Sequence, residues 1–380
     1  MLNKSEKGIP FLILSDTNTL MGYIGKRDSQ LDAYRGLIMI YIVCVVHVMF
    51  WLNFRKEPFL SICLFEMPVI FYISGGSYSL SLNQRNFIEI LGNRIKRVIL
   101  PFLIYALTST IFFILIQFVF PNDPYSYTLN NFIKLLLTET VPELPFVRHL
   151  WFVLPYMVVI CLLGFEVRII ENLGGTIFLT ICILCFSLST YLFVSNGLIL
   201  KEVLLYNIFC LAGYLTYKKP QFISKNRMYF ILIFLGSLLI LSYVIYERKF
   251  CPMQSHKFLP DLVFLAYGIV SLFLIIFIFS KIKIPLLYIV ELWNKRGYTI
   301  YLYQNVVYFI FIHILSEYRI FNNFILDFLF SSVCIFMIST LLSYLTYPYE
   351  KMMIKKIMNN THIITNKFRR YFISNYEYNK

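Results

Sequence analysis

The sequence predicts an all-α fold, a polytopic membrane helix bundle with about ten transmembrane helices. Its 380 residues are 59% hydrophobic and only 14% charged, and the mean hydropathy is +0.70. A soluble domain has about 25% charged residues, so this chain has too few charges to cover a soluble surface of its size. The composition therefore excludes a soluble enzyme and indicates a chain embedded in lipid.

Long apolar runs are the second observation behind this fold class. A helix needs about 20 apolar residues to cross a bilayer core of about 30 Å. Ten runs qualify, and we place them at 33–52, 60–82, 99–120, 150–167, 176–194, 203–217, 228–246, 262–280, 298–315 and 324–347. We expect a cytoplasmic N-terminal segment at 1–30, a transmembrane domain at 31–350 and a basic cytoplasmic tail at 351–380.

The distribution of positive charge is the third observation. The net charge is +14, and Lys and Arg collect in cytoplasmic loops of membrane proteins. With both termini inside, 24 of the 34 Lys and Arg residues fall in inside segments and nine in outside segments. We therefore expect a multi-pass protein of the cell (inner) membrane, N-in and C-in. Charges scattered over short loops argue against a nucleic-acid partner, and membrane lipid is the expected partner of the basic tail.

The first apolar run, "LDAYRGLIMIYIVCVVHVMFWL", contains ionisable residues that a lipid-facing helix would exclude. Asp32 and Arg35 lie at its cytoplasmic end, and His47 lies well inside. Such groups cost roughly 2.5 kcal/mol or more in a bilayer core unless they face a cavity or a partner. His47 is suited to act as a general base near neutral pH, or it hydrogen-bonds a neighbouring helix; the residues alone leave both open.

The second run, "FEMPVIFYISGGSYSLSL", contains Glu66 near its outer end. Glu66 is either a partner for His47 or an interfacial residue. The small-residue step that begins at Ser74, close to Tyr72, allows either close helix approach or a break that lines a cavity. We place Tyr72 and Ser74 among residues that line a substrate tunnel.

A basic cluster follows in "NRIKRVILPF", where Arg94, Lys96 and Arg97 lie just inside the membrane and Pro101 begins the next helix. Arginine offers a planar, bidentate fork to phosphate oxygens, so this cluster could bind a phosphate-bearing substrate. The alternative is an ordinary positive-inside cluster.

Two further stretches place polar residues where an acceptor or a tunnel would lie. "FVRHLWFV" puts Arg148, His149 and Trp151 at the outer end of the fourth run, as substrate contacts or as surface and belt residues. "WNKRGYTIYLYQN" opens the ninth run with a polar stripe on one helix face, which either lines a cavity or hydrogen-bonds other helices. That stripe comprises Tyr298, Tyr301, Gln304 and Asn305.

These motifs together resemble the acyltransferase-3 family of integral membrane acyltransferases. "LDAYRGLIMIYIVCVVHV", "MPVIFYISGGSYSL", "NRIKRVILPF", "RHLWFV" and "GYTIYLYQN" occur in this order and spacing, from about residue 27 to 310. The resemblance implies transfer of acetyl or other acyl groups from cytoplasmic acyl-CoA, without a metal, to sugar hydroxyls of cell-surface or lipid-linked polysaccharides. It implies that His47 is the catalytic base and Arg35 essential, and it makes Arg94 and Arg97 candidates for the CoA phosphates.

The sequence departs from the family pattern at two places. Gln304 follows Tyr303 where many members have a histidine. Eleven residues separate Arg35 from His47, one more than in the family. Twelve steps of about 100° leave the two side chains about 120° apart, whereas eleven steps would leave about 20°.

A π-turn absorbs one extra residue within an α-helix. We therefore predict a π-turn somewhere from Gly36 to Val46, with Arg35 and His47 facing a common cavity. Gly36 is one place that could hold it, because glycine lacks a Cβ and tolerates unusual dihedrals. The alternative is that Arg35 precedes the helix and reaches the tunnel from a loop.

Acyl transfer to a hydroxyl needs a base, a stabilised oxyanion and two substrates that meet. Asp32 lies about 22 Å from His47 along an ideal helix, so we expect Asp32 to pair with Arg35 or another cation at the mouth. Glu66 is the better candidate partner of His47. Two other functions share these features. A transporter or flippase of a lipid-linked sugar also holds intramembrane ionisable groups, and a transmembrane N-acetyltransferase of an amino sugar is a related enzyme.

Overall fold

The computed structural model describes residues 28–82, 87–119, 151–192, 198–282, 285, 287–314, 320–321 and 323–378. Within these ranges the regular elements are helices, and no strand occurs. Nine of the described helical stretches are long and apolar enough to cross a membrane. The predicted all-α polytopic membrane bundle is therefore confirmed, while the orientation of the termini stays a prediction.

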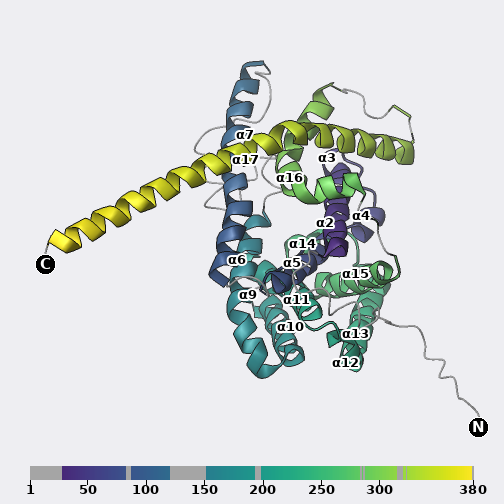
Figure 1. The fold of residues 1–380 in the computed structure, drawn as a ribbon. Helices are drawn as coiled ribbons and strands as arrows, with labels where there is room; N and C mark the ends of the chain where they lie inside the picture. The colour runs from purple at the N-terminus through teal and green to yellow at the C-terminus, as the bar shows by residue number, and fades with distance from the viewer. Residues whose placement is uncertain are drawn as a thin grey trace, which may run out of the picture. The chain divides into compact units, whose positions relative to one another are not determined.

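Figure 1 shows the helices in chain order. They are α2 (Ser29–Tyr41), the π-helix η2 (Ile42–Val46), α3 (His47–Trp51), α4 (Phe59–Ile62), α5 (Glu66–Leu82), α6 (Phe87–Arg94), the π-helix η3 (Ile95–Ile99), α7 (Leu100–Val119), α9 (Val153–Leu173), α10 (Gly175–Leu192), α11 (Leu198–Lys218), α12 (Phe222–Lys225), α13 (Arg227–Tyr246), α14 (Met253–Phe258), α15 (Leu262–Lys281), α16 (Tyr288–Ile314) and α17 (Phe324–Tyr378).

Nine of the ten predicted runs correspond to candidate spans, and the run at 298–315 does not. That run forms most of α16, a helix of 27 residues. Its tyrosines, Gln304 and Asn305 lower the hydropathy of α16, which is why composition alone does not select it as a span.

The chain divides into two compact units. The first takes in the chain up to Ile42 with residues 55–90 and 154–294, and the second takes in 43–54, 91–153 and 295–380. The boundaries fall inside four helical stretches, α2–η2–α3, α6, α9 and α16, so each of these contributes residues to both units.

The core of the first unit is the contact between α5 and α11. In each of these two helices, 72% of the most apolar stretch is buried. A Cβ at Gly75 would overlap the backbone carbonyl of Cys210, and one at Gly213 would overlap that of Tyr72. The small residues after Tyr72 therefore serve close helix approach, and α5 continues through them without a break.

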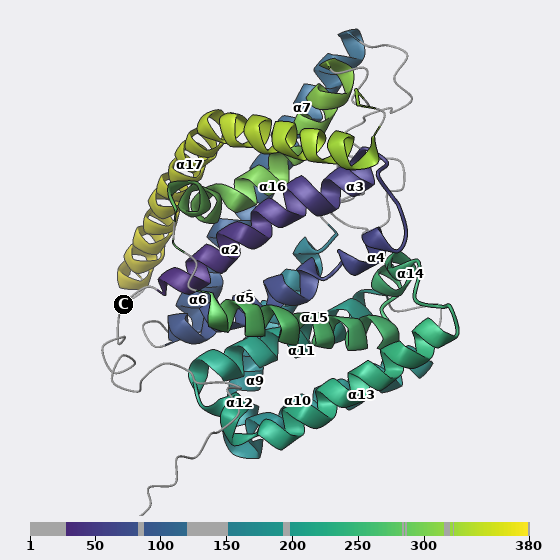
Figure 2. The ribbon, with the colours of Figure 1, turned by 90° about the vertical axis from the view of Figure 1, so that its right-hand side faces the viewer.

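Other helices of the first unit surround this core. Figure 2 shows α13 and α15 side by side, and α10 packs on α11. Only 22% of the apolar stretch of α13 is buried, and Leu232 and Leu239 are among its exposed side chains. An apolar, exposed outer face is what a lipid-facing helix needs, because lipid replaces the protein contacts.

The second unit contains α17, which packs on α3 and α7. α17 has 55 residues, with Pro348 in its interior, and Figure 1 shows it as one continuous helix. The expected boundary at residue 350 between the membrane domain and the tail therefore lies within a helix. The placement of the tail on the inner leaflet stays a prediction.

Candidate active site

The helical stretch that holds Arg35 and His47 contains the predicted π-turn. The π-helix η2 covers Ile42–Val46, directly before His47. The prediction of a π-turn in this region is therefore confirmed. The alternative that Arg35 precedes the helix is wrong, since α2 begins at Ser29.

The π-turn does not lie at Gly36, the one position that the sequence analysis named for it, because Gly36 is in regular α-helix. A Cβ at Gly36 would overlap the carbonyl oxygen of Val290, so this glycine allows close packing between α2 and α16. With the extra residue taken up by η2, the spacing from Arg35 to His47 approaches that of eleven regular steps. Whether both side chains face one cavity stays a prediction.

His47 is hydrogen-bonded within the second unit. Its Nδ1 lies 2.6 Å from Oε1 of Gln304, which is fully buried on α16. An amide oxygen only accepts, so Nδ1 carries the hydrogen and the lone pair of a neutral ring is on Nε2. This tautomer is the one in which the imidazole can accept a proton at Nε2.

Aromatic rings surround this pair. The ring of Tyr301, one turn before Gln304, lies 5.6 Å from that of His47, and Phe152 meets Tyr301 edge to face at 5.2 Å. On the same helix, Asn305 Nδ2 donates to the Tyr105 hydroxyl at 3.2 Å. The polar stripe of α16 thus makes inter-helix hydrogen bonds, one of the two alternatives that the sequence left open.

Arg35 lies within the first unit, in a polar cluster. One guanidinium nitrogen lies 3.2 Å from Oδ1 of Asp32 and 3.3 Å from Oδ1 of Asn294, and the other donates to Ser77. The predicted pairing of Asp32 with Arg35 is confirmed. The Arg35 side chain is 37% exposed and that of Asp32 only 8%, so the fixed guanidinium keeps access to solvent.

Glu66 forms a buried ion pair with Lys257, on α14 of the same unit. Their side chains are 3% and 7% exposed. The second carboxylate oxygen of Glu66 is buried without a hydrogen-bond partner among the described atoms. The structure therefore gives Glu66 a cationic partner, and its pairing with His47 stays a prediction.

The segment that carries Lys257 is fixed by its neighbour His256. His256 Nδ1 lies 2.6 Å from Asp261 and Nε2 lies 3.0 Å from the Lys249 carbonyl oxygen. The hydrogen bond to Asp261 raises the pKa of His256, because both ring nitrogens face acceptors. Because the pKa of His256 is higher in the folded protein, its protonated ring stabilises the fold. This stabilisation is complete below the pKa of the unfolded state, about 6.5, and is lost as the pH rises through the pKa of the folded state.

The basic cluster lies on a second π-helix. Lys96 and Arg97 are exposed on η3, and Arg94, the last residue of α6, is half-buried. Pro101 lies just after η3, at the second position of α7 rather than at a helix start. Proline lacks the N–H of a regular ladder, and an adjoining π-turn is one way for a helix to continue past it.

The structure describes some of the other predicted site residues and leaves others outside its described ranges. Arg148 and His149 lie outside the described residues, whereas Trp151 is described and half-buried. Tyr72 and Ser74 are buried in the first unit, and their tunnel role stays a prediction. In the part of the chain that the structure describes, no three His, Cys, Asp or Glu side chains gather as metal ligands.

Sequence reasoning missed three partners: Ser77 and Asn294 of Arg35, and Lys257 of Glu66. Asn294 offered a weak signal, since it lies four residues before Tyr298 in the polar stretch that opens the ninth run. Lys257 offered one, because a buried carboxylate in a membrane protein calls for a cation. Gln304 was identified, but as a lining residue rather than as the partner of His47.

Fold and site define a polytopic, all-α membrane protein with a histidine held in base-competent form inside a helix bundle. A family model described as an acyltransferase domain matches residues 28–347, and the chain belongs to this family, acyltransferase-3. The protein is therefore a membrane acyltransferase. A search of curated proteins finds no significant match. A search of solved structures also finds none.

Proposed function

We propose that the protein transfers an acetyl or other short acyl group from cytoplasmic acyl-CoA to a sugar hydroxyl of a cell-surface or lipid-linked polysaccharide in the cell (inner) membrane. The observation that carries the proposal is the 2.6 Å contact between His47 Nδ1 and the Gln304 amide oxygen. With the hydrogen on Nδ1, the lone pair of the neutral ring is on Nε2, the atom that would accept the proton in acyl transfer to a hydroxyl.

In the proposed reaction His47 Nε2 takes the proton of the sugar hydroxyl as its oxygen attacks the thioester carbonyl carbon. The new C–O bond forms, the tetrahedral intermediate collapses and the C–S bond breaks. The imidazolium then returns its proton to the CoA thiolate, so that free CoA and the O-acyl sugar are the products. No metal is needed for this sequence, because the thiolate is a good leaving group.

Gln304 has a second feature that supports the mechanism. Its amide nitrogen is buried and has no hydrogen-bond partner among the described residues. A donor held beside the general base could stabilise the developing oxyanion. We propose that the side-chain oxygen of Gln304 orients His47 and that its side-chain nitrogen donates a hydrogen bond to the carbonyl oxygen of the thioester.

The basic residues are proposed to bind the acyl-CoA donor. Arg94, Lys96 and Arg97 would bind the CoA phosphates, since arginine matches phosphate geometry in a bidentate manner. The guanidinium of Arg35, held by Asp32, Asn294 and Ser77, is pre-oriented and would need little ordering on binding. The proposed residues that line the path of the acceptor are Tyr72, Ser74, Arg148, His149, Trp151, Tyr301 and Asn305.

The direct test is acyl-CoA turnover by the purified protein in lipid nanodiscs, with release of free CoA as the readout. We expect release that depends on a glycan acceptor, and O-acyl groups in the surface polysaccharide of cells that express the protein, detected by mass spectrometry. Absence of CoA release with every acceptor, together with passage of a lipid-linked sugar across vesicles, would establish the transporter function instead. Transfer to an amine alone would establish N-acetylation.

Substituting Gln304 separates its two proposed roles. Gln304→Leu removes the acceptor and the donor, and we expect kcat to fall roughly 100-fold or more. Gln304→Glu keeps an acceptor for Nδ1–H but loses the donor, so we expect an intermediate loss. The carboxylate also favours imidazolium, and the acidic limb of the pH–rate profile should move to higher pH.

The matched control on the same helix is Tyr298→Phe, which removes a hydrogen bond to the Val98 carbonyl and should leave kcat near wild type. A kcat of Gln304→Leu equal to that of the wild type would show that Gln304 has neither role. If Gln304→Glu keeps the kcat of the wild type while Gln304→Leu does not, Gln304 positions His47 but does not stabilise the oxyanion.

Replacing the basic cluster tests donor binding. Arg94→Ala with Arg97→Ala should raise the KM for acyl-CoA about tenfold or more with a smaller change in kcat, because lost phosphate contacts weaken binding more than chemistry. Initial rates over a range of acyl-CoA concentrations give both constants. Lys355→Ala with Lys356→Ala, exposed on α17, is the control of equal charge change. A fall in kcat at unchanged KM would contradict the assignment.

A further inference from the structure

A basic pocket lies in the first unit, where four candidate spans end. α9 ends at Leu173, α10 begins at Gly175, α11 ends at Lys218 and α13 begins at Arg227. The pocket between them has a volume of about 630 Å³, within the range of about 300–1,000 Å³ of small-molecule sites. Spans change from apolar to polar at the lipid headgroups, so the pocket lies at headgroup depth.

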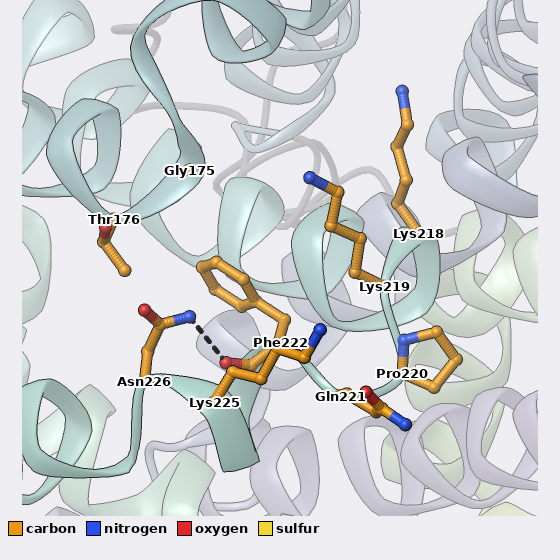
Figure 3. Close-up of a pocket in the computed structure, with 9 residues that line it drawn as sticks. All are labelled: Gly175, Thr176, Lys218, Lys219, Pro220, Gln221, Phe222, Lys225 and Asn226. Carbon is orange, nitrogen blue, oxygen red and sulfur yellow. Dashed lines mark hydrogen bonds between the residues drawn. The ribbon is translucent and has the colours of Figure 1, made fainter.

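The charge of the pocket is positive. Three of its nine lining residues are lysines, Lys218, Lys219 and Lys225, and none is acidic. Figure 3 shows Lys218 and Lys219 extending from the end of α11, with Lys225 on α12. Lys218 forms an ion pair with Glu171 at 2.8 Å, which leaves two positive charges in excess.

Neutral polar groups and an apolar floor complete the pocket. Thr176, Gln221 and Asn226 line it, and Asn226 is held by a 2.8 Å hydrogen bond from its Nδ2 to the Phe222 carbonyl (Figure 3). The Phe222 side chain is only 6% exposed, and a Cβ at Gly175 would crowd it at 3.0 Å. The floor is therefore packed, and Lys219 and Lys225 remain to meet a ligand at the rim, since Lys218 is paired with Glu171.

Exposed apolar side chains lie within two residues of lining residues of the pocket along the chain. Leu173, Ile177 and Met228 lie on the spans that end here and are 46%, 57% and 69% exposed. A soluble phosphate compound would leave these apolar side chains exposed, whereas the acyl chains of a lipid would cover them. Basic pockets between membrane helices are a recurrent way of holding anionic headgroups.

We propose that this pocket binds the phosphate-bearing headgroup of an anionic membrane lipid. Lys219 and Lys225 contact the phosphate, the neutral side chains bind the rest of the headgroup, and the acyl chains lie along α9, α10 and α13. The inference concerns a site separate from acyl transfer and does not depend on the proposed function.

The test is native mass spectrometry of the whole protein in a neutral detergent, titrated with phosphatidylglycerol and, in parallel, with phosphatidylcholine. We expect one phosphatidylglycerol to be retained in preference to phosphatidylcholine. Lys219→Gln with Lys225→Gln should weaken this binding about 30-fold, since each basic residue near an anionic lipid contributes about fivefold. Lys219→Arg with Lys225→Arg should retain it, and Arg248→Gln with Lys249→Gln, at two exposed residues after α13, is the charge-matched control.

Three results would overturn the proposal. The first is unchanged phosphatidylglycerol binding by the Lys219 and Lys225 glutamine variant. The second is an equal loss in the Arg248 and Lys249 control, which would show attraction to net charge alone. The third is displacement of phosphatidylglycerol by millimolar inorganic phosphate or CoA, which would make the pocket a site for soluble phosphates. Thermal unfolding of each variant near the wild-type temperature shows that the comparison is between folded proteins.

Discussion

Replacing His47 by alanine is expected to abolish acyl transfer, lowering kcat by about a thousandfold or more while the protein stays folded in detergent. General-base catalysis contributes about 10²–10⁴-fold, and no other histidine has its nitrogen against Gln304 in the described site. The measurement is the rate of CoA release at saturating acyl-CoA and acceptor. Binding of acyl-CoA should persist, because the loss concerns the chemical step.

Val48→Ala provides the control for His47→Ala. Val48 is the next residue on α3 and is fully buried, so its truncation costs packing without removing a proton acceptor. Its kcat should stay within a few-fold of the wild type. Comparable activity in His47→Ala and the wild type would rule out the general-base role. An equal loss in Val48→Ala would show that the helix tolerates no cavity there.

The second large effect concerns stability. Lys257→Met should destabilise the protein by about 3–5 kcal/mol, because it leaves the Glu66 carboxylate buried and uncompensated. The double variant Glu66→Gln with Lys257→Met should recover most of this loss, since the amide carries no charge. Unfolding in a denaturing detergent gives the free energies of unfolding of Lys257→Met, Glu66→Gln, the double variant and the wild type.

This comparison also decides the role of Glu66. If the ion pair is structural, the double variant should keep kcat close to the wild type. If Glu66 instead orients His47, as the sequence predicted, Glu66→Gln should lower kcat in the single and the double variant alike. Wild-type stability of Lys257→Met would show that the buried ion pair contributes nothing.

Local features of the chain proved predictable. Hydropathy averaged over about 20 residues predicted nine of the candidate spans, because crossing a bilayer constrains each helix by itself. The pairing of Asp32 with Arg35 follows from their i, i+3 spacing on one helix. The π-turn at Ile42–Val46 followed from the spacing of two residues in one helix.

The sequence by itself therefore determined the class of protein, the helices and the irregular turn before His47. Only the tertiary structure decided the partners: Gln304 for His47, Asn294 for Arg35 and Lys257 for Glu66. These residues are 257, 259 and 191 positions apart in the chain. Helix formation and hydropathy act within a window of residues, whereas these contacts depend on how distant helices pack, and that information is spread over the whole sequence.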